Sequence, residues 1–425
     1  MTESIRRNSP DRVLNKNKII NDPVYGFIPI KSEKIFDLIE HPFLQRMRHI
    51  RQLGLAELVY PGAIHTRFHH AIGATHLMRQ ALEILRTKGA ELSDDETEAA
   101  QIAILLHDIG HGPFSHALEE TLLPSIQHES LSFLFMKELN RQFSGALALA
   151  IRIFQNTYPK KFLHQLVSSQ LDLDRLDYLN RDSFFTGVRE GAVGTDRIIA
   201  MLNVVKGRLV VEEKGIYNIE NFLNARRLMY WQVYLHKTSV SAERLLVNII
   251  KRAQYLASSG EPVPASESLS LFLNNKFSLD DFAERRNILN AFGQLDDYDV
   301  WGAIKLWQSN RDPVLARLCN MLLNRNLFQI KLAAGSIQKT DVEKLKNLIC
   351  REWKLTKSDA VYMFSHGTVS NEAYLSERNS IQVLMKSGHL LDVAQASDLP
   401  NIKAMSNIVK KNYLCWPKNL SLYPQ

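Results

Sequence analysis

The most constraining feature of the sequence is a buried apolar stretch that ends in ionisable side chains. Residues 99–106 (AAQIAILL) are nearly all apolar, and His107 and Asp108 follow them directly. Burying this pair is costly unless a partner compensates, and a divalent cation compensates well because imidazole nitrogen and carboxylate oxygen are both good ligands. A capping pair at a helix end is the plainer interpretation, and for an isolated His-Asp dipeptide it would be preferred.

Neighbouring residues favour the metal interpretation. His111 and His116 follow in the string HDIGHGPFSH, and His128 comes soon after. Two more polar segments stand apart from it, HTRFHH (65–70) and LDLDRLDY (171–178). Each segment alone would more often be structural, but the three together predict a metal site.

The periodicity predicts a mainly α protein with small β-hairpins. Residues 15–30 are expected to be extended, because turn formers interrupt Ile, Val and Tyr. Residues 208–219 are expected to form a hairpin around Glu213-Lys214-Gly215. Helices are expected over residues 41–54, 69–88, 94–112, 128–143, 147–154, 161–180 and 220–256. The helix that follows the N-cap Ser93 would place His107 and His111 on one face, and Pro113 would end it.

A turn-rich segment, residues 258–268, is the best candidate for a domain boundary. It divides the chain into a core over residues 1–257 and a C-terminal region over residues 258–425. We expect the second part to be helical to about Trp353 and to carry some strand beyond it, with a turn at Lys386-Ser387-Gly388.

Composition narrows the class of protein. Three widely spaced cysteines form no CxxC pair, which argues against a disulfide framework and fits a reducing, cytoplasmic setting. The sequence has no run of about 18 apolar residues, so it predicts no membrane span. The N-terminal charges are not followed by the apolar run that is typical of a secretory signal. The net charge of +7 suits an anionic ligand such as a nucleotide. It does not indicate nucleic-acid binding, because Lys and Arg are scattered along the chain.

The order His70, His107-Asp108, Asp174 resembles the H…HD…D pattern of HD-domain phosphohydrolases. Over residues 18–256 the chain resembles more closely the deoxynucleoside triphosphate triphosphohydrolases, relatives of the vertebrate SAM- and HD-domain restriction factor, and we expect no SAM domain. The strings that carry this likeness are NDPVYGFIPI, QRMRHIRQLG, VYPGAIHTRFHHAIG, LLHDIGHGPFSHALE, LDLDRLDYLNRD and ARRLMYWQVYLHK. The implied fold is an HD-domain helical core followed by a C-terminal α(+β) region for packing or oligomerisation.

The resemblance implies one divalent metal ion, which could be Fe, Mn, Mg, Ni or Zn. Its implied ligands are His70, His107, Asp108 and Asp174. The implied catalytic residues are His111, His116, His128 and Glu119, the last replacing the family's usual Asp. Among these we expect His116 to lie nearest the α-phosphate and His111 to donate to a phosphate oxygen. His65 and His69 occupy no ligand position, so structural roles are expected for both.

Substrate contacts follow from the same resemblance. Arg67 and Arg226 match positions that grip triphosphate oxygens, and Arg175 replaces the usual Lys. The remaining implied contacts are Tyr178 and Asp182 to phosphate and sugar, Gln52 and Leu53 near the 3′-hydroxyl, and Tyr234 against the deoxyribose. Leu235 and Tyr230 replace the family's glutamine and histidine on the base side, which leaves base and sugar preference open.

The expected reaction is hydrolysis of a dNTP to deoxynucleoside and triphosphate. The first alternative is another nucleotide phosphohydrolase, namely a nucleotidase or a cyclic-nucleotide or alarmone phosphodiesterase. A catalytically silent nucleotide- or nucleic-acid-binding module is the second. By resemblance, a homo-oligomer (dimer or tetramer) with a regulatory nucleotide near Lys18, Asn21, Glu40 and Arg48 is a further hypothesis.

Overall fold

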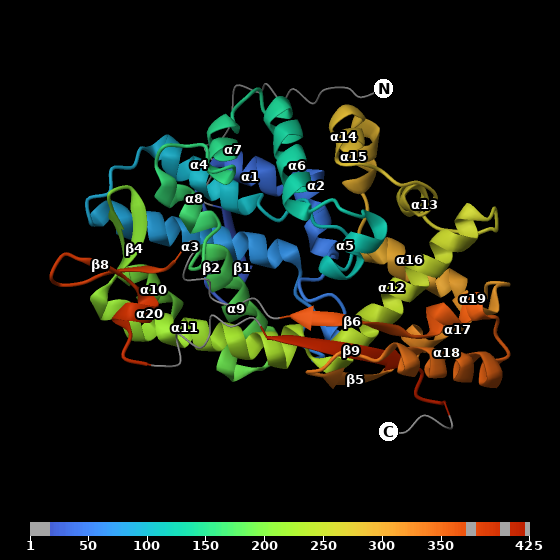
Figure 1. Cartoon of the computed structure of the whole chain (residues 1–425). Coiled ribbons are helices and arrows are strands. Elements are labelled where there is room, and N and C mark those ends of the chain that lie inside the picture. Colours follow the sequence, from blue (N-terminus) through green and yellow to red (C-terminus); the bar gives the residue numbers. More distant parts are fainter. Residues whose placement is uncertain (1–17, 371–379, 400–408, 421–425) are drawn as a thin grey trace.

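A computed structural model of the chain describes residues 18–370, 380–399 and 409–420 (Figure 1). These residues are mainly helical with small sheets, as the sequence predicts. A single hydrophobic core joins residues from both sides of the proposed boundary, including Leu246 on one side and Leu318 on the other. The division into two units stays a prediction. None of the helices in these three stretches is both long and apolar enough to cross a bilayer.

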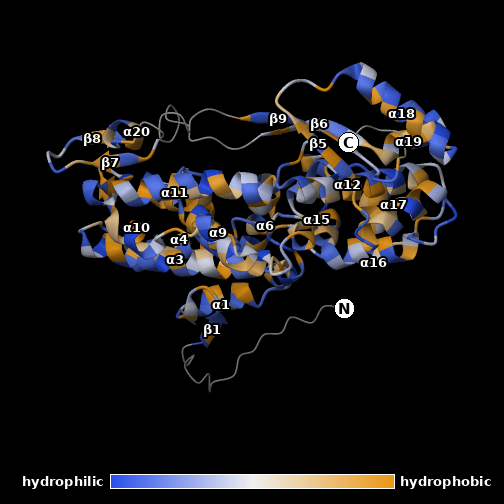
Figure 2. Cartoon of the chain, turned by 90° about the horizontal axis from the view of Figure 1, so that it is seen from below, coloured by the Kyte–Doolittle hydropathy of each residue, from blue (hydrophilic) through white to orange (hydrophobic). Residues whose placement is uncertain are grey.

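The central helix of the fold is α3 (Arg67–Thr87). It packs against α4 (Asp94–Leu105) and α9 (Leu173–Thr186), and α4 also packs against α7 (Ala148–Phe154) and α8 (Lys161–Val167). In Figure 2, α3 and α11 (Ile216–Met229) run as two parallel rows, with α4 and α9 between them in this view. This bundle carries every metal-ligand candidate, because those residues lie at or near the ends of α3, α4 and α9.

The N-terminal segment forms the expected extended structure as a two-stranded hairpin. Strand β1 (Lys18–Asp22) pairs with β2 (Gly26–Ile30), and the turn needs Gly26, whose φ is +71°. Residues 15–17 of the prediction lie outside the described residues. The short helices α1 (Glu33–Ile39) and α2 (Pro42–Gln45) follow and pack the hairpin against the bundle.

The C-terminal region is attached through the long helix α12 (Lys237–Ser258), which packs against α5 (His116–Leu122). The other helices after α5 are α6 (His128–Gln142), α10 (Thr195–Met201), α13 (Glu267–Asn274), α14 (Leu279–Glu284), α15 (Arg286–Phe292), α16 (Asp297–Trp307), α17 (Pro313–Leu323), α18 (Lys339–Trp353), α19 (Lys357–Ala360) and α20 (Val393–Ala396). Figures 1 and 2 place α16–α19 at one end of the molecule and α20 at the other.

Two further sheets complete the described part of the fold. One has the order β3-β4-β7-β8, with a parallel contact between β4 and β7, and the other has the antiparallel order β5-β9-β6. The strands are β3 (Leu202–Val205), β4 (Arg208–Glu212), β5 (Gln329–Ala333), β6 (Ser365–Ser370), β7 (Gln382–Leu384), β8 (Leu390–Asp392) and β9 (Lys410–Trp416). The turn predicted at residues 386–388 joins β7 and β8, so it is confirmed.

The helix expected to reach residue 112 ends at Leu105, and this prediction is wrong. His107 and Asp108 lie in a series of turns, so His107 and His111 do not share a helix face. The turns allow a close approach of α6, because a Cβ on Gly110 would overlap the backbone of His128 and Ser132. The N-terminal part of the prediction is confirmed, since Ser93 caps the helix together with Glu96.

Three other long helices are interrupted. Residues 41–54 form only α2 and one 3-10 turn (Arg46–His49) before the backbone extends at Arg51 to bridge Thr66. Residues 161–180 divide into α8 and α9, because the side chain of Asp172 caps a new helix. Residues 220–256 divide into α11, a π-helical turn (Tyr230–Tyr234) and α12. In each case local capping or a widened turn overrides the apolar periodicity.

The hairpin expected over residues 208–219 is displaced by several residues. It runs from β3 to β4 and turns at Lys206-Gly207, both with positive φ, whereas Glu213–Gly215 forms one 3-10 turn before α11. The helix predicted over residues 69–88 begins two residues earlier, at Arg67, and ends at Thr87.

Candidate metal centre and active site

Four side chains from three elements converge on one point. His70 lies on the first turns of α3, His107 and Asp108 follow α4, and Asp174 lies in the first turn of α9. The Nε2 atoms of His70 and His107 are 3.4 Å apart, and Asp174 Oδ1 lies 3.1 Å and 3.5 Å from them. Asp108 Oδ1 lies 3.3 Å from His107 Nε2, and its Oδ2 lies 3.8 Å from His70 Nε2.

These spacings fit a shared divalent cation. Ligand atoms held about 2.0–2.2 Å from one ion lie roughly 3.0–3.6 Å from each other in tetrahedral or octahedral geometry. His107 Nδ1 lies 2.6 Å from the carbonyl oxygen of Ile104, which directs its Nε2 toward the other three ligands. The ligand atoms of His70, His107 and Asp174 lie close enough together to hold a metal ion.

The electrostatics of the four residues also suit a cation. Burial would raise the pKa of Asp108 and Asp174, but the neighbouring His107, with Arg67 beside Asp108 and His70 beside Asp174, holds both well below their ordinary value. Burial would lower the pKa of His70, yet contacts with Asp174 and Asp177 raise it to about 10. A cation at Nε2 would compete with that proton, so metal binding should strengthen as the pH rises.

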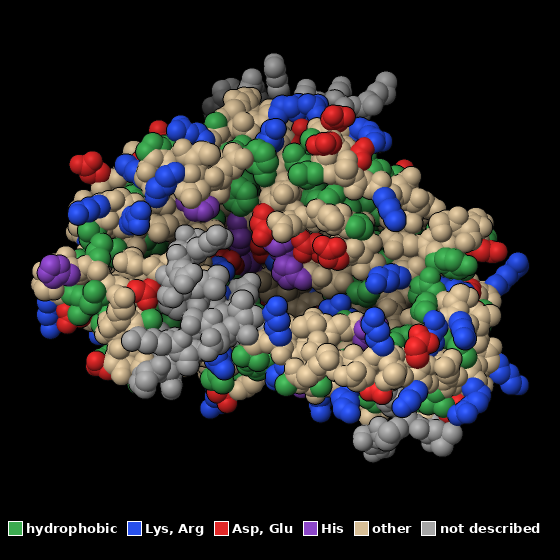
Figure 3. All heavy atoms as spheres, viewed as in Figure 1, with side chains coloured by type: hydrophobic (Ala, Val, Ile, Leu, Met, Phe, Trp, Pro, Cys, Tyr) green, Lys and Arg blue, Asp and Glu red, His purple; other side chains and the backbone are tan. Residues whose placement is uncertain are grey.

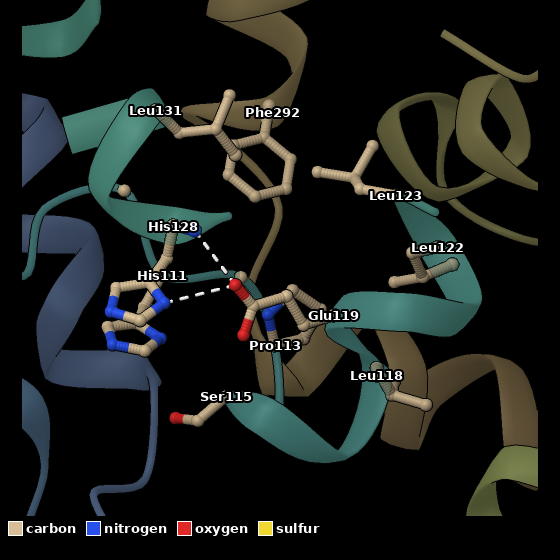
Figure 4. A pocket seen from close by; sticks show the side chains of 12 residues that line it. His111, Pro113, Ser115, Leu118, Glu119, Leu122, Leu123, His128, Leu131 and Phe292 are labelled. Atoms are coloured by element: carbon tan, nitrogen blue, oxygen red, sulfur yellow. Dashed lines mark hydrogen bonds and ion pairs between the residues drawn. The ribbon is translucent and has the colours of Figure 1, made fainter. Parts of the chain in front are cut away.

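A second cluster, formed by His111, His116, His128 and Glu119, lies beside the first. Glu119 contacts Nδ1 of His116 at 3.0 Å. It also contacts His128 Nδ1 at 3.0 Å and accepts the backbone N–H of His128 at 2.8 Å (Figure 4). These contacts hold the pKa of Glu119 well below its ordinary value, although burial would raise it. His111 Nε2 lies 3.5 Å from Asp108 Oδ1, which joins the two clusters.

The arrangement of this histidine cluster differs from a metal cage. The rings of His111 and His128 are stacked, with centroids 3.8 Å apart and planes 19° apart. The lone pairs of stacked rings lie in nearly parallel planes, so they converge poorly on one ion, although three nitrogens of this cluster lie close enough for one. Burial and the nearby Arg67 lower the pKa of His111, which keeps this ring neutral. The side chain of His116, in contrast, is 70% exposed.

A cavity of ≈ 540 Å³ opens beside both clusters. Figure 3 shows a hollow near the centre of this face, where histidine and acidic side chains gather. Most of the predicted site residues line it: Gln52, Leu53, Arg67, His107, Asp108, His111, His116, His128, Asp174, Arg175, Tyr178, Asp182 and Tyr234. Tyr230 and Leu235, the two departures from the family pattern, line it as well.

Three of the predicted residues, His70, Glu119 and Arg226, do not line the cavity. His70 is fully buried beneath the other ligands, and Glu119 contacts His116 and His128 from behind. Arg226 does not line the cavity; its Nη1 donates to Gln170 Oε1 at 3.0 Å. Arg67 lines the cavity but is buried, contacting Asp108 and donating to Ser115 Oγ at 2.8 Å. Lys18, Asn21, Glu40 and Arg48 are exposed and line no part of it.

The two histidines expected to be structural hold other side chains in place. His65 Nε2 lies 2.7 Å from Asp182 Oδ1, and His69 Nδ1 accepts the N–H of Thr66 at 3.2 Å, capping α3. The hydroxyl of Tyr234 donates to Asp182 Oδ2 at 2.9 Å, so Asp182 is fixed from both sides.

Sequence reasoning missed part of the wall. Ser115 and three residues of α12, namely Ser239, Glu243 and Arg244, also line the cavity. Ser239 Oγ, Arg244 Nε and Gln52 Oε1 are buried and have no hydrogen-bond partner among the described residues. Buried polar atoms nearly always have partners, so this wall is where a ligand would supply them. Ser239 and Glu243 are four residues apart, as on one face of a helix, and this spacing was the available signal. The predicted helix began at residue 220, so it did not show which face lines the cavity.

Known proteins share this arrangement. The HD domain family matches residues 67–182, and a region described as HD-associated matches residues 193–261. The protein YwfO of Bacillus subtilis is 30% identical over 97% of this chain and 94% of its own length. The chain belongs to the HD-domain phosphohydrolase family.

Two other relatives extend the comparison for this HD-domain phosphohydrolase. A phosphohydrolase crystal structure from Bacteroides thetaiotaomicron is 49% identical, with a TM-score of 0.92 over 95% of this chain and 100% of that one. The deoxynucleoside triphosphate triphosphohydrolase SAMHD1 homolog of Dictyostelium discoideum is 30% identical over 60% of this chain and 53% of its own length. The chain therefore spans about half the length of that enzyme.

Proposed function

We propose that this HD-domain phosphohydrolase hydrolyses deoxynucleoside triphosphates to deoxynucleoside and inorganic triphosphate, with a divalent cation held by His70, His107, Asp108 and Asp174. The observation that carries the proposal is that one cavity joins the four-ligand cluster, the histidine cluster and a wall suited to a nucleoside. Relatives named deoxynucleoside triphosphate triphosphohydrolases support it, because they are 30% and 28% identical over 60% and 59% of this chain.

The metal end of the cavity would take the phosphates. The cation would polarise a phosphoryl oxygen and activate a water against the phosphorus atom. Arg175, whose Nη1 contacts Asp172 at 2.6 Å, adds positive charge to the cavity wall beside Asp174. His111, kept neutral by its buried position, suits a hydrogen-bond donor to a phosphate oxygen.

His116 is the best-placed general acid. Its Nδ1 is held by Glu119, so its Nε2 is available to the cavity that it lines. A proton delivered from Nε2 to the 5′-oxygen would let the nucleoside leave, and a histidine oriented by a carboxylate suits that task. Glu119, whose own pKa is held low by its histidine contacts, stays ionised and fixes the His116 ring.

The other wall would take the sugar and base. Tyr234 lines the cavity and donates its hydroxyl hydrogen to Asp182, so its ring can pack on a deoxyribose and its hydroxyl hydrogen is not available to a 2′-OH. Gln52 Oε1 has no hydrogen-bond partner within the described part of the chain, which suits it to accept a hydrogen bond from a sugar hydroxyl.

The experiment is product identification across a nucleotide panel. The full chain is loaded separately with Mn²⁺, Fe²⁺, Mg²⁺, Ni²⁺ or Zn²⁺ and incubated with dNTPs, NTPs, nucleoside monophosphates and cyclic nucleotides. Anion chromatography should detect tripolyphosphate and deoxynucleoside in equal amounts, with dNTPs favoured over NTPs. The matched control is His107→Ala. Release of orthophosphate or pyrophosphate alone would refute the proposal, and no turnover with any metal would favour a binding module.

A further inference from the structure

A chain of buried hydrogen bonds leaves the metal centre from the far side of His70. His70 Nδ1 lies 2.7 Å from Asp177 Oδ2, and both side chains are fully buried. With its Nδ1–H given to Asp177, the imidazole has its lone pair at Nε2, where the other three ligands converge. Asp177 therefore sets both the tautomer and the orientation of this ligand.

Asp177 is itself fixed by Arg181, one turn further along α9. Arg181 donates from Nε to Asp177 Oδ2 and from Nη2 to Oδ1, each at 3.0 Å. This two-point contact between planar groups leaves the carboxylate little freedom to rotate. Since the guanidinium of Arg181 is also fully buried, its position depends on what holds its other side.

The other side of Arg181 reaches the N-terminal hairpin. Arg181 Nη1 lies 2.7 Å from Asp22 Oδ2, and Nη2 lies 3.4 Å from Oδ1. Asp22 is the last residue of β1, and its Oδ1 also accepts the N–H groups of Val24 and Tyr25, each at 2.9 Å. One carboxylate thus closes the hairpin turn and anchors the arginine.

The central helix α3 leaves space for the hydrogen-bonded groups of Asp177 and Arg181. A Cβ on Gly73, three residues after His70 on α3, would overlap the Asp177 carboxylate and the Arg181 guanidinium. The absence of a side chain at this position is what lets an ion pair lie flat against α3. The three groups Asp22, Arg181 and Asp177 together carry a net charge of −1, which favours a cation on the other side of His70.

We propose that Asp22 and Arg181 are positioning residues of the metal centre, so that the β1–β2 hairpin fixes the ligand His70 through the sequence Asp22–Arg181–Asp177. The proposal rests on metal binding at the four ligands and is independent of the substrate. A substitution in the hairpin turn, remote from the cavity, should therefore weaken metal binding.

The test measures Co²⁺ binding to the full-length chain without any substrate. The dissociation constant comes from competition with a fluorescent chelator, and the visible absorption of the Co²⁺-loaded protein reports the ligand geometry. Changing the direct partner of a metal-bound histidine typically costs about 10–100-fold in affinity, so Asp177→Asn should fall in that range. Asp22 is connected to His70 through Arg181 and Asp177, so Asp22→Asn should weaken Co²⁺ binding roughly 3–10-fold and alter the Co²⁺ spectrum.

The variants separate this role from stability of the hairpin. Asp22→Asn keeps an oxygen for the Val24 and Tyr25 N–H groups but loses the charge facing Arg181. Gly73→Ala places a methyl group of α3 against the Asp177 carboxylate and the Arg181 guanidinium. Phe27→Ala, at a 74% exposed hairpin position, is the matched control and should bind Co²⁺ like the wild type.

Weaker Co²⁺ binding and a changed spectrum in folded Asp22→Asn and Gly73→Ala would support the proposal. Wild-type affinity and spectrum in both variants would overturn the proposal. A loss confined to Asp22→Ala, which also removes the contacts with the Val24 and Tyr25 N–H groups, would overturn it as well. Failure of the wild type to bind Co²⁺ would also overturn it. Absence of nucleotide hydrolysis alongside normal Co²⁺ binding would refute only the proposed function.

Discussion

The two clusters beside the cavity are built in opposite ways. Three of the four ligand candidates, His70, His107 and Asp108, are buried, and the Asp174 side chain is 24% exposed. They come from α3, the turns after α4, and α9, and His70 is held from behind by Asp177 and Arg181. The histidine cluster depends on one carboxylate, Glu119, and its His116 side chain is 70% exposed. A metal ligand needs a fixed position, whereas a group that transfers a proton to substrate needs access. This difference is the basis for proposing that the first cluster binds the metal and that the second transfers protons.

The largest expected effect comes from breaking the first cluster. His107→Ala should lose bound metal and lower the rate of hydrolysis by more than about 1000-fold, because a bound cation contributes several kcal/mol to the transition state. Metal content by mass spectrometry and initial rates with a dNTP check it. A variant that stays loaded and active would remove His107 from the ligand set.

His116→Ala should show that the two clusters have different roles. The variant should keep its metal and lose about 100- to 10,000-fold in kcat, which is the usual range for removing a general acid. The affinity for Co²⁺ serves as the control and should match the wild type. Equal losses of metal and activity would mean that the histidine cluster also binds the ion.

The sequence identified both clusters but could not show how they differ. The ligand candidates were predictable because ionisable residues interrupt apolar helices at His70, His107 and Asp174, and burial of such residues needs compensation. The turns after Leu105 were not predictable, because they depend on the approach of α6 over Gly110, which is a tertiary contact. The same limit applies to Ser239 and Arg244 of α12, which line the cavity and follow a π-helical turn that the apolar periodicity does not predict.

Asp297 connects the C-terminal region to the loop between the clusters. Its carboxylate accepts the N–H groups of Phe114, at 2.7 Å, and of Arg51, at 2.9 Å, and burial raises its pKa to about 7. Its folded pKa lies above its unfolded value, so the native state loses stability as the pH rises from about 4 to 7.

Replacing Asp297 with asparagine should remove this pH dependence. Relative to the wild type, the free energy of unfolding of Asp297→Asn should improve by on the order of 2 kcal/mol between pH 5 and pH 8. Urea denaturation at both pH values measures the change. Parallel pH profiles for the two proteins would show that Asp297 is ionised throughout this range.

The smallest effect concerns the wall of α12. Ser239→Ala should raise KM about 2- to 10-fold with little change in kcat, because one hydrogen bond contributes about 0.5–1.5 kcal/mol. The control is Ser258→Ala at the other end of the same helix, away from the cavity. Unchanged KM in Ser239→Ala would place the substrate elsewhere in the cavity.

The contrast between the clusters is tested most directly by locating the metal in crystals of the Mn²⁺-loaded protein through its anomalous scattering. The account predicts one strong peak about 2.0–2.3 Å from His70 Nε2, His107 Nε2 and the carboxylates of Asp108 and Asp174. A peak bound instead by His111, His116 and His128, or no peak at either cluster, would contradict it.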